Sequence, residues 1–117
     1  MSKILENAKT HFKSKLNGEL QKISVEEWKS DVYFKGTYPF AVESKIIELQ
    51  QQGKTVEALV ESVIAKALNM DGQPMFGKFD KVSLMNEVDP QVLIRVATAL
   101  NNGTMEYNQP MEETVKN

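Results

Sequence analysis

The stretch from Thr55 to Leu68 constrains the fold most, because its apolar residues recur at intervals of three and four. These residues are Val56, Leu59, Val60, Val63, Ile64, Ala67 and Leu68. Such a stripe forms one face of an α-helix, and other elements must cover it. Thr55 is suited to cap the helix, and Glu57, Glu61 and Lys66 fall on its polar side. The sequence therefore predicts a helical domain built around this segment.

A second helix is predicted directly before the first, over residues 40–52. Its apolar positions are Phe40, Val42, Ile46, Ile47 and Leu49. Gly53 follows it, and glycine is the residue most suited to the position after a helix end. Because only Gly53 and Lys54 separate the two segments, we expect them to fold back on each other as a helical hairpin.

Three further helices are expected, one along the apolar residues from Ile4 to Leu16 and two over residues 81–87 and 90–101. In the first, Ile4, Leu5, Ala8, Phe12 and Leu16 form an apolar stripe, and Asn17-Gly18 ends the helix. Asp80 is placed to cap the second. Asp89 and Pro90 open the third as an acidic cap followed by proline at the first helical position. Asn101-Asn102-Gly103 is expected to end it.

Residues 20–35 have a different period. Two β-rich runs, 20–25 and 31–35, surround the segment 26–30, which contains the single tryptophan, Trp28. Runs of this kind predict a β-hairpin with a longer loop, which must pack on helices to be stable. An extended arm at residues 32–34 is the alternative.

The elements together predict a mainly α fold. We expect one domain of about five helices with a small β-hairpin near residues 20–35, since 117 residues suit a single domain. The domain is expected to span residues 1–103. From Thr104 onward the apolar period fails, and residues 104–117 are expected to be a disordered acidic tail.

Composition excludes several classes of function. The chain has no cysteine and one histidine, His11, which removes thiolate metal sites and thiol nucleophiles and leaves a histidine metal site without support. Fourteen Lys and Arg against sixteen Asp and Glu lack the basic excess of a nucleic-acid-binding surface. No run approaches the roughly 18 apolar residues of a membrane span. We expect a small cytoplasmic protein that binds neither nucleic acid nor membrane.

Two local patterns resemble ligand sites but lack essential parts. Gly53-Lys54-Thr55 resembles the end of a phosphate-binding loop, yet Glu48 stands where that loop needs a glycine. Residues 69–72 resemble a calcium loop, yet Lys78 stands where a bidentate carboxylate is needed. A helix end and a plain turn explain both patterns.

Catalytic residues are also not indicated. Glu87 and Asp89 are two carboxylates close in sequence, but Asp89 already has a capping role, and acid–base chemistry needs a pair with different pKa values facing one pocket. The serines lack a Gly-x-Ser-x-Gly context. We expect no enzyme activity, no catalytic residue, no metal and no cofactor.

Two longer stretches are more specific. A helix ending in Lys66-Ala67-Leu68 is followed by Asp71-Gly72-Gln73-Pro74-Met75-Phe76, and later comes Val88-Asp89-Pro90-Gln91-Val92-Leu93-Ile94-Arg95. Upstream lies the tryptophan-containing hairpin that ends in Val32-Tyr33-Phe34-Lys35. Over roughly residues 3–101, this order resembles the tail assembly chaperones of long-tailed bacteriophages.

The resemblance implies a role in phage tail morphogenesis. Such chaperones hold the tape measure protein soluble, help to recruit tail tube subunits, act in the host cytoplasm during infection or from a prophage, and are absent from the virion. Many are made in two lengths by a ribosomal frameshift, and this chain would correspond to the short product. A homo-oligomer stays open.

The client would be a long helix with apolar faces, held by helix-in-groove packing. The candidate protein-binding residues are Met75, Phe76, Phe79 and Met85, with Trp28 and Phe40 as second choices. For each of them, burial in the core is the competing interpretation. The alternative function is a small helical protein-binding adaptor or regulator of phage or bacterial origin.

Overall fold

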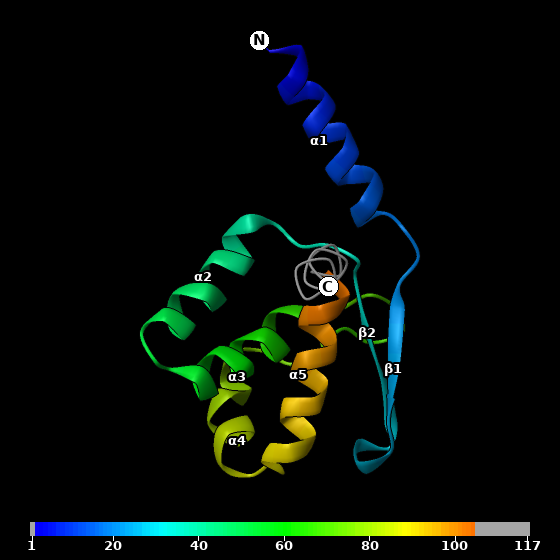
Figure 1. The fold of residues 1–117 in the computed structure, drawn as a ribbon. Coiled ribbons are helices and arrows are strands. Elements are labelled where there is room, and N and C mark those ends of the chain that lie inside the picture. Colours follow the sequence, from blue (N-terminus) through cyan, green and yellow to red (C-terminus); the bar gives the residue numbers. More distant parts are fainter. Residues whose placement is uncertain (1, 105–117) are drawn as a thin grey trace, which may run out of the picture.

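The structure is a computed structural model that describes residues 2–104 (Figure 1). In this part of the chain the α-helices are α1 (Lys3–Leu16), α2 (Phe40–Gln51), α3 (Thr55–Lys66), α4 (Lys81–Asn86) and α5 (Pro90–Thr104). The strands are β1 (Gln21–Val25) and β2 (Ser30–Phe34), and two short 3₁₀ turns are η1 (Glu26–Trp28) and η2 (Lys78–Asp80). The predicted mainly α fold with one small β-hairpin is confirmed.

The hairpin is an antiparallel pair in which Ile23 lies opposite Val32. Lys29, with a φ of 53°, takes the left-handed conformation that closes the turn after η1. On its other edge β2 is fixed to the body, because Tyr33 and Leu68 exchange two backbone hydrogen bonds of 2.9 and 2.7 Å. The alternative of an extended arm at residues 32–34 is therefore wrong.

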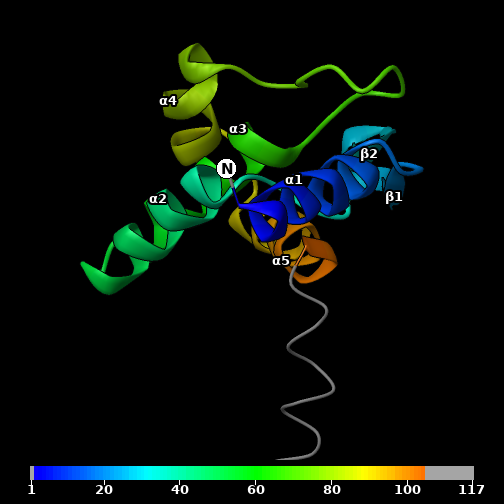
Figure 2. The ribbon, with the colours of Figure 1, turned by 90° about the horizontal axis from the view of Figure 1, so that it is seen from above.

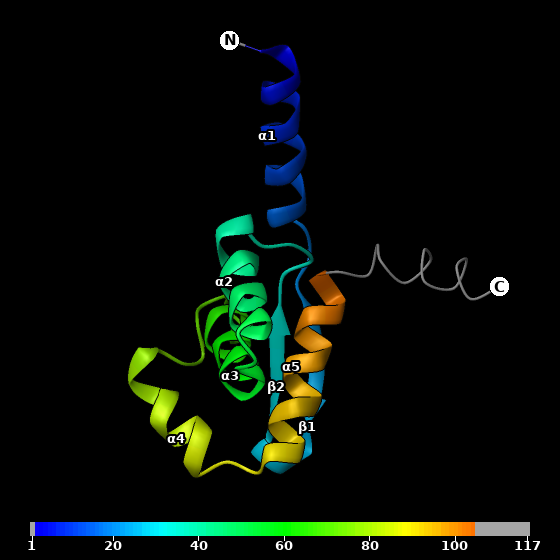
Figure 3. The ribbon, with the colours of Figure 1, turned by 60° about the vertical axis from the view of Figure 1, so that its left-hand side comes forward.

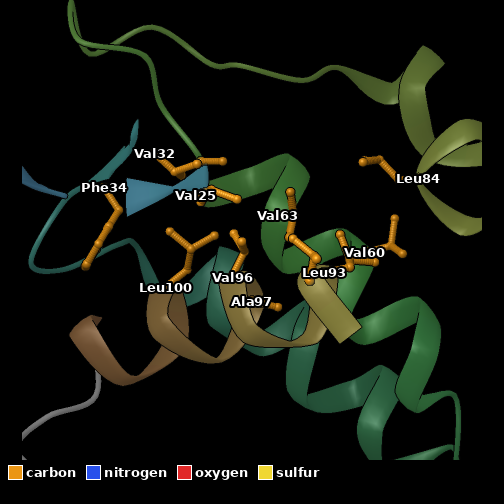
Figure 4. Close-up of a cluster of buried hydrophobic side chains, with 12 residues drawn as sticks. Val25, Val32, Phe34, Val60, Val63, Leu84, Leu93, Val96, Ala97 and Leu100 are labelled. Carbon is orange, nitrogen blue, oxygen red and sulfur yellow. The ribbon is translucent and has the colours of Figure 1, made fainter. Parts of the chain in front are cut away.

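The core lies where α3, α5 and the hairpin meet (Figure 4). This cluster contains Val63 of α3, Val96 and Leu100 of α5, and Val25 and Val32 of the hairpin. All five side chains are fully buried. Seen from above, α2 and α4 lie on the side of α3 away from the hairpin (Figure 2). Helix α3 is therefore the centre of the fold, as its apolar stripe predicts.

The helical hairpin of α2 and α3 is confirmed. Gly53 has a φ of 79° between the two helices, a conformation that glycine adopts without the steric cost that a Cβ brings. The predicted capping role of Thr55 is wrong: Thr55 is the first residue of α3, and no side chain caps the helix. The first backbone hydrogen bond of α3 runs from the N–H of Ala58 to the carbonyl of Lys54. Lys54, and not Thr55, is therefore the residue at the cap position.

The position of Lys66 in the sequence predicts that it lies on the polar, solvated side of α3. In the structure Lys66 is fully buried. Its Nζ donates to both carboxylate oxygens of Glu43 in α2, at 2.8 and 3.0 Å, and to Oδ1 of Asn101 in α5, at 2.9 Å. The Tyr38 ring lies 5.5 Å from the same Nζ. The apolar spacing of α3 alone does not indicate that α2 and α5 also cover the side of α3 that carries Lys66.

Asn69 organises the turn after α3. Its Oδ1 accepts hydrogen bonds from the backbone N–H groups of Asp71 and Gln73, at 2.9 and 3.0 Å, and Gly72 has a φ of 82°. The interpretation of residues 69–72 as a turn is confirmed. In residues 2–104, no group of three or more His, Cys, Asp and Glu is arranged to hold a metal ion.

Of the two predicted acidic helix caps, Asp89 is confirmed and Asp80 is wrong. Asp89 accepts a hydrogen bond from the backbone N–H of Gln91 at 3.0 Å and opens α5, as expected. Asp80 accepts from the backbone N–H of Gly77 at 2.8 Å instead, so it stabilises η2 and does not cap α4.

Helix α5 continues to Thr104, past the stop expected at residues 101–103. The predicted tail therefore lies, from residue 105 onward, outside the described residues.

Helix α1 forms as predicted, with Ser2 Oγ accepting from the N–H groups of Ile4 and Leu5. Unlike α3 and α5, this helix contributes nothing to the core. No side chain of α1 is buried, and the helix projects from the body (Figure 1). In its apolar stripe, Ile4 and Leu5 are exposed, whereas Phe12 and Leu16 are half-buried.

None of the helices in the described part of the chain has the length and apolar character to span a membrane.

Candidate protein-binding surface

The six candidate residues fall into three groups by exposure and place. Trp28, Met75 and Phe76 are half-buried and pack against the core. Phe79 and Met85, at 96% and 40% exposure, lie on η2 and α4. Phe40, at 77% exposure, is the first residue of α2.

The half-buried group holds the long loop after α3 to the body. The rings of Trp28 and Phe76 meet edge to face, with centroids 5.9 Å apart and an interplanar angle of 80°, a favoured aromatic geometry. The backbone N–H of Met75 donates to the carbonyl of Ala67 at 3.0 Å. These three side chains are therefore partly buried against the core.

The exposed group belongs to a short apolar row. Phe79, Val82 and Met85 are three residues apart in a continuous helical segment formed by η2 and α4. Residues at this spacing lie on one face. Val82 is 70% exposed. The row therefore presents three large apolar side chains to solvent on one side of α4.

A small groove lies beside this row, between α4 and the first turns of α3 and α5. Its lining consists of Val56, Leu59, Leu84, Met85, Val88, Pro90, Leu93 and Ile94. The cavity measures about 70 Å³, far below the roughly 300–1,000 Å³ of small-molecule sites. A groove of this size suits one apolar side chain of a partner protein. We call the row and the groove together the α4 surface.

Two of the groove's lining residues are themselves well exposed. Val56, at 57% exposure, begins α3, and Ile94, at 47%, lies in the second turn of α5. Contiguous exposed apolar side chains of this kind mark protein-interaction sites on soluble domains. Phe40 is not among the groove's lining residues.

Ion pairs fix the elements that carry the α4 surface. Lys81 of α4 lies 3.3 Å from both Glu57 and Glu61 of α3, and hydrogen bonds to Glu61 and Glu57 raise the pKa of Lys81. Arg95 of α5 donates to both carboxylate oxygens of Glu27 in η1, at 2.6 and 3.1 Å. These bonds lower the pKa of Glu27. These exposed ion pairs link α4 to α3, and α5 to the turn of the hairpin.

Sequence reasoning missed Val82, Val56 and Ile94. The spacing between Phe79 and Met85 indicates Val82, because a residue three positions from each must share their face. No comparable signal exists for Val56, since it belongs to the stripe of residues 55–68, which predicts burial. Ile94 lies off the apolar face of its helix, so the spacing of that helix was compatible with its exposure. The buried face consists of Val92, Leu93, Val96, Ala97 and Leu100.

Comparisons with known proteins identify the fold. No family model matches the chain, and no curated protein sequence matches it. Among solved structures, the tail assembly chaperone of bacteriophage HK97 superimposes with a TM-score of 0.55 at 19% identity, over 83% of this chain and 99% of that one. This chain therefore has the fold of the HK97 tail assembly chaperone, and the resemblance indicated by its sequence motifs is confirmed at the level of the fold.

Proposed function

We propose that this chain is a phage tail assembly chaperone, which binds the tape measure protein and helps to recruit tail tube subunits without performing catalysis. The observation that carries the proposal is the fold likeness, which covers nearly the whole HK97 protein. The chain would work in the host cytoplasm, during infection or from a prophage. Because likeness of fold does not by itself fix a function, the surface of the molecule provides a second line of support.

The α4 surface suits a client of the kind proposed. A row of apolar side chains beside a groove for one side chain is the arrangement that receives an amphipathic helix. A tape measure protein supplies such helices along its length. Many copies of a small domain are needed to cover a client of that shape.

The test is co-expression of the chain with the tape measure protein of the same genome, measuring solubility and co-purification. We expect the tape measure protein to be soluble only with this chain and to elute bound to it. Val82→Glu should reduce the amount bound at least about tenfold, since it places a charge in a desolvated apolar contact. Phe40→Glu is the matched control, because Phe40 is equally exposed but lies outside the α4 surface.

Two results would count against the proposal. A tape measure protein that stays insoluble, or dissolves without binding, leaves the adaptor or regulator as the function. Loss of binding in Phe40→Glu but not in Val82→Glu would move the site to α2.

Gene order offers an independent check: a chaperone gene should lie between the tube gene and a very long tape measure gene, with an overlapping reading frame at its end.

A further inference from the structure

The first half of α1 presents large apolar side chains to solvent. Ile4 is 80% exposed and Leu5 is 48% exposed. Further along the same side of the helix, Phe12 and Leu16 are half-buried. From Ile4 to Leu16 this apolar side is about 18 Å long, or a little over three turns. It therefore has the length to pair with about three turns of one partner helix.

Positive charge is concentrated on α1. Four of the chain's fourteen basic residues lie in this helix, but only one of its sixteen acidic residues does. By helical spacing, Lys9 and Lys13 lie along one edge of the apolar side, and Lys15 lies along the other edge. All three are exposed, and within residues 2–104 none of them forms an ion pair. The apolar side is therefore bordered by lysines on both edges.

The opposite side of α1 offers little to a partner. Its hydroxyl groups bond within the helix, because Thr10 Oγ1 donates to the carbonyl of Glu6 at 3.0 Å and Ser14 Oγ donates to the carbonyl of His11 at 2.9 Å. A partner is therefore expected on the side that combines Leu5 with the lysines. The complement of that side is an apolar surface bordered by carboxylates.

An amphipathic helix with acidic edges fits this description best. In paired helices, charged residues beside the apolar seam choose partners with residues of opposite charge at the matching positions. A second α1 does not fit, since it would bring lysines against lysines. A lipid surface fits less well, because only Ile4 and Leu5 are exposed enough to enter it, and stable attachment to lipid needs more apolar insertion.

We propose that α1 is a second docking surface, which takes an acidic amphipathic helix of the client. The inference rests on the proposed function for the source of that helix, the tape measure protein. One helix face gives an interface in the weak range, below about 1,200 Å² in total, so this contact forms reversibly and selects acidic segments of the client.

The position of α1 suits a second contact. Helix α1 projects from one end of the molecule, whereas α4 and the beginning of α5 form the other (Figure 3). One copy therefore contacts a long client at two separated places. Two linked contacts hold a client more tightly than either contact alone.

Two designed peptides test the charge preference of α1. Both are amphipathic helices with the same leucine seam, and the edges of the seam carry glutamate in the acidic probe and lysine in the basic probe. Fluorescence anisotropy measures the binding of each labelled peptide to the full chain. We expect the acidic probe to bind at least about tenfold more tightly than the basic probe. Added salt should reduce this ratio, because exposed charges are screened.

Variants of the full chain assign the binding to α1. Leu5→Glu should weaken binding of the acidic probe about tenfold, whereas the double variant Lys9→Glu and Lys13→Glu should reverse the preference between the probes. Thr10→Glu is the matched control, because Thr10 is exposed on the opposite side of the same helix. Val82→Glu, on the α4 surface, should also leave binding of the acidic probe unchanged. Circular dichroism checks that each variant remains folded.

Overlapping peptides of the tape measure protein test the source of the helix. The peptides whose binding is lost in Leu5→Glu but kept in Thr10→Glu should be amphipathic and acidic at the edges of their apolar side. Basic or uncharged peptides with this behaviour would overturn the inference.

Three other results would also overturn it. These are equal binding of the two designed probes, equal loss of binding in Thr10→Glu and Leu5→Glu, and tighter binding to vesicles of phosphatidylserine and phosphatidylcholine than to the acidic probe. The last result would assign α1 to a lipid surface.

The proposed function is judged separately, because the designed probes contain no client sequence. A chain that binds the acidic probe through α1 but never holds the tape measure protein keeps the partner chemistry of α1 and loses the function. A chain that holds the tape measure protein but does not distinguish the two probes keeps the function and loses this inference.

Discussion

Lys66 is a buried charged residue at a position where the sequence predicts a solvated side chain. Its ammonium group donates hydrogen bonds to Glu43 and Asn101, and the amide of Asn101 donates in turn to Ser62 Oγ at 3.1 Å. Burial lowers the pKa of Lys66, and the bond to Glu43 opposes that change. The network joins α2 to α3 and α5 at a place where α2 itself buries only Ile46.

Removing this charge should destabilise the fold. Lys66→Met leaves the Glu43 carboxylate without its buried partner, and we expect the free energy of unfolding to fall by about 3 kcal/mol. The matched control is Lys45→Met, because Lys45 is exposed and lies 3.9 Å from Glu61; its effect should stay within about 0.5 kcal/mol. Urea denaturation measures both, and equal effects of the two substitutions would refute a structural role for the buried pair.

The ion pair of Arg95 and Glu27 should make the stability of the fold depend on pH. Its hydrogen bonds lower the pKa of Glu27 below the ordinary 4.5. A folded-state pKa below the unfolded value means that the stabilisation is complete above 4.5 and is lost as the pH falls through the lower, folded value. Titration of the Glu27 carboxyl carbon by NMR should give this lowered pKa, and Arg95→Met should return it toward 4.5. An unchanged pKa in that variant would contradict the assignment.

Single residues were predictable where the cause is local. The Asp89 cap and the Asn69 turn depend on neighbours two to four positions away, and both are confirmed. The burial of Lys66 depends on α2 and α5, which lie far from it in sequence, so no pattern around Lys66 could indicate it. The exposure of Val56 has the same kind of cause.

At the scale of elements, the helices follow from their periodicity, but their packing does not. The stripes of α1 and α3 have the same form in the sequence, yet α3 is the centre of the core and α1 has no buried side chain. Amphipathic spacing predicts that a helix has a face to cover. It does not identify what covers that face, which for α3 is α5 and the hairpin.

Substitutions in α1 should therefore spare the fold. We expect Ile4→Glu to change the free energy of unfolding by no more than about 0.5 kcal/mol, because Ile4 touches no core. Leu100→Ala, at a fully buried position in α5, should cost about 3 kcal/mol. Urea denaturation at low protein concentration measures both effects. It is monitored by the fluorescence of Trp28, whose ring packs against Phe76. A large effect of Ile4→Glu would mean that α1 packs on its own body.

At the scale of the whole molecule, the fold persists at 19% identity to the HK97 protein. Fold class and element order were predictable, because they depend on where apolar residues recur and where turn residues interrupt them. The candidate surface was only partly predictable. Phe79 and Met85 lie on it, whereas Met75, Phe76 and Trp28 serve the packing of the loop, since exposure depends on how much neighbouring helices cover.

The separation of α1 from the core has a consequence for how such proteins diverge. Mutations in the body must preserve packing among α3, α5 and the hairpin, whereas mutations in α1 meet no such constraint from within the same copy. Selection can act on this helix only through whatever binds it. Across descendants of this gene, the exposed residues Ile4 and Leu5 should therefore vary independently of the core residues Val63 and Leu100.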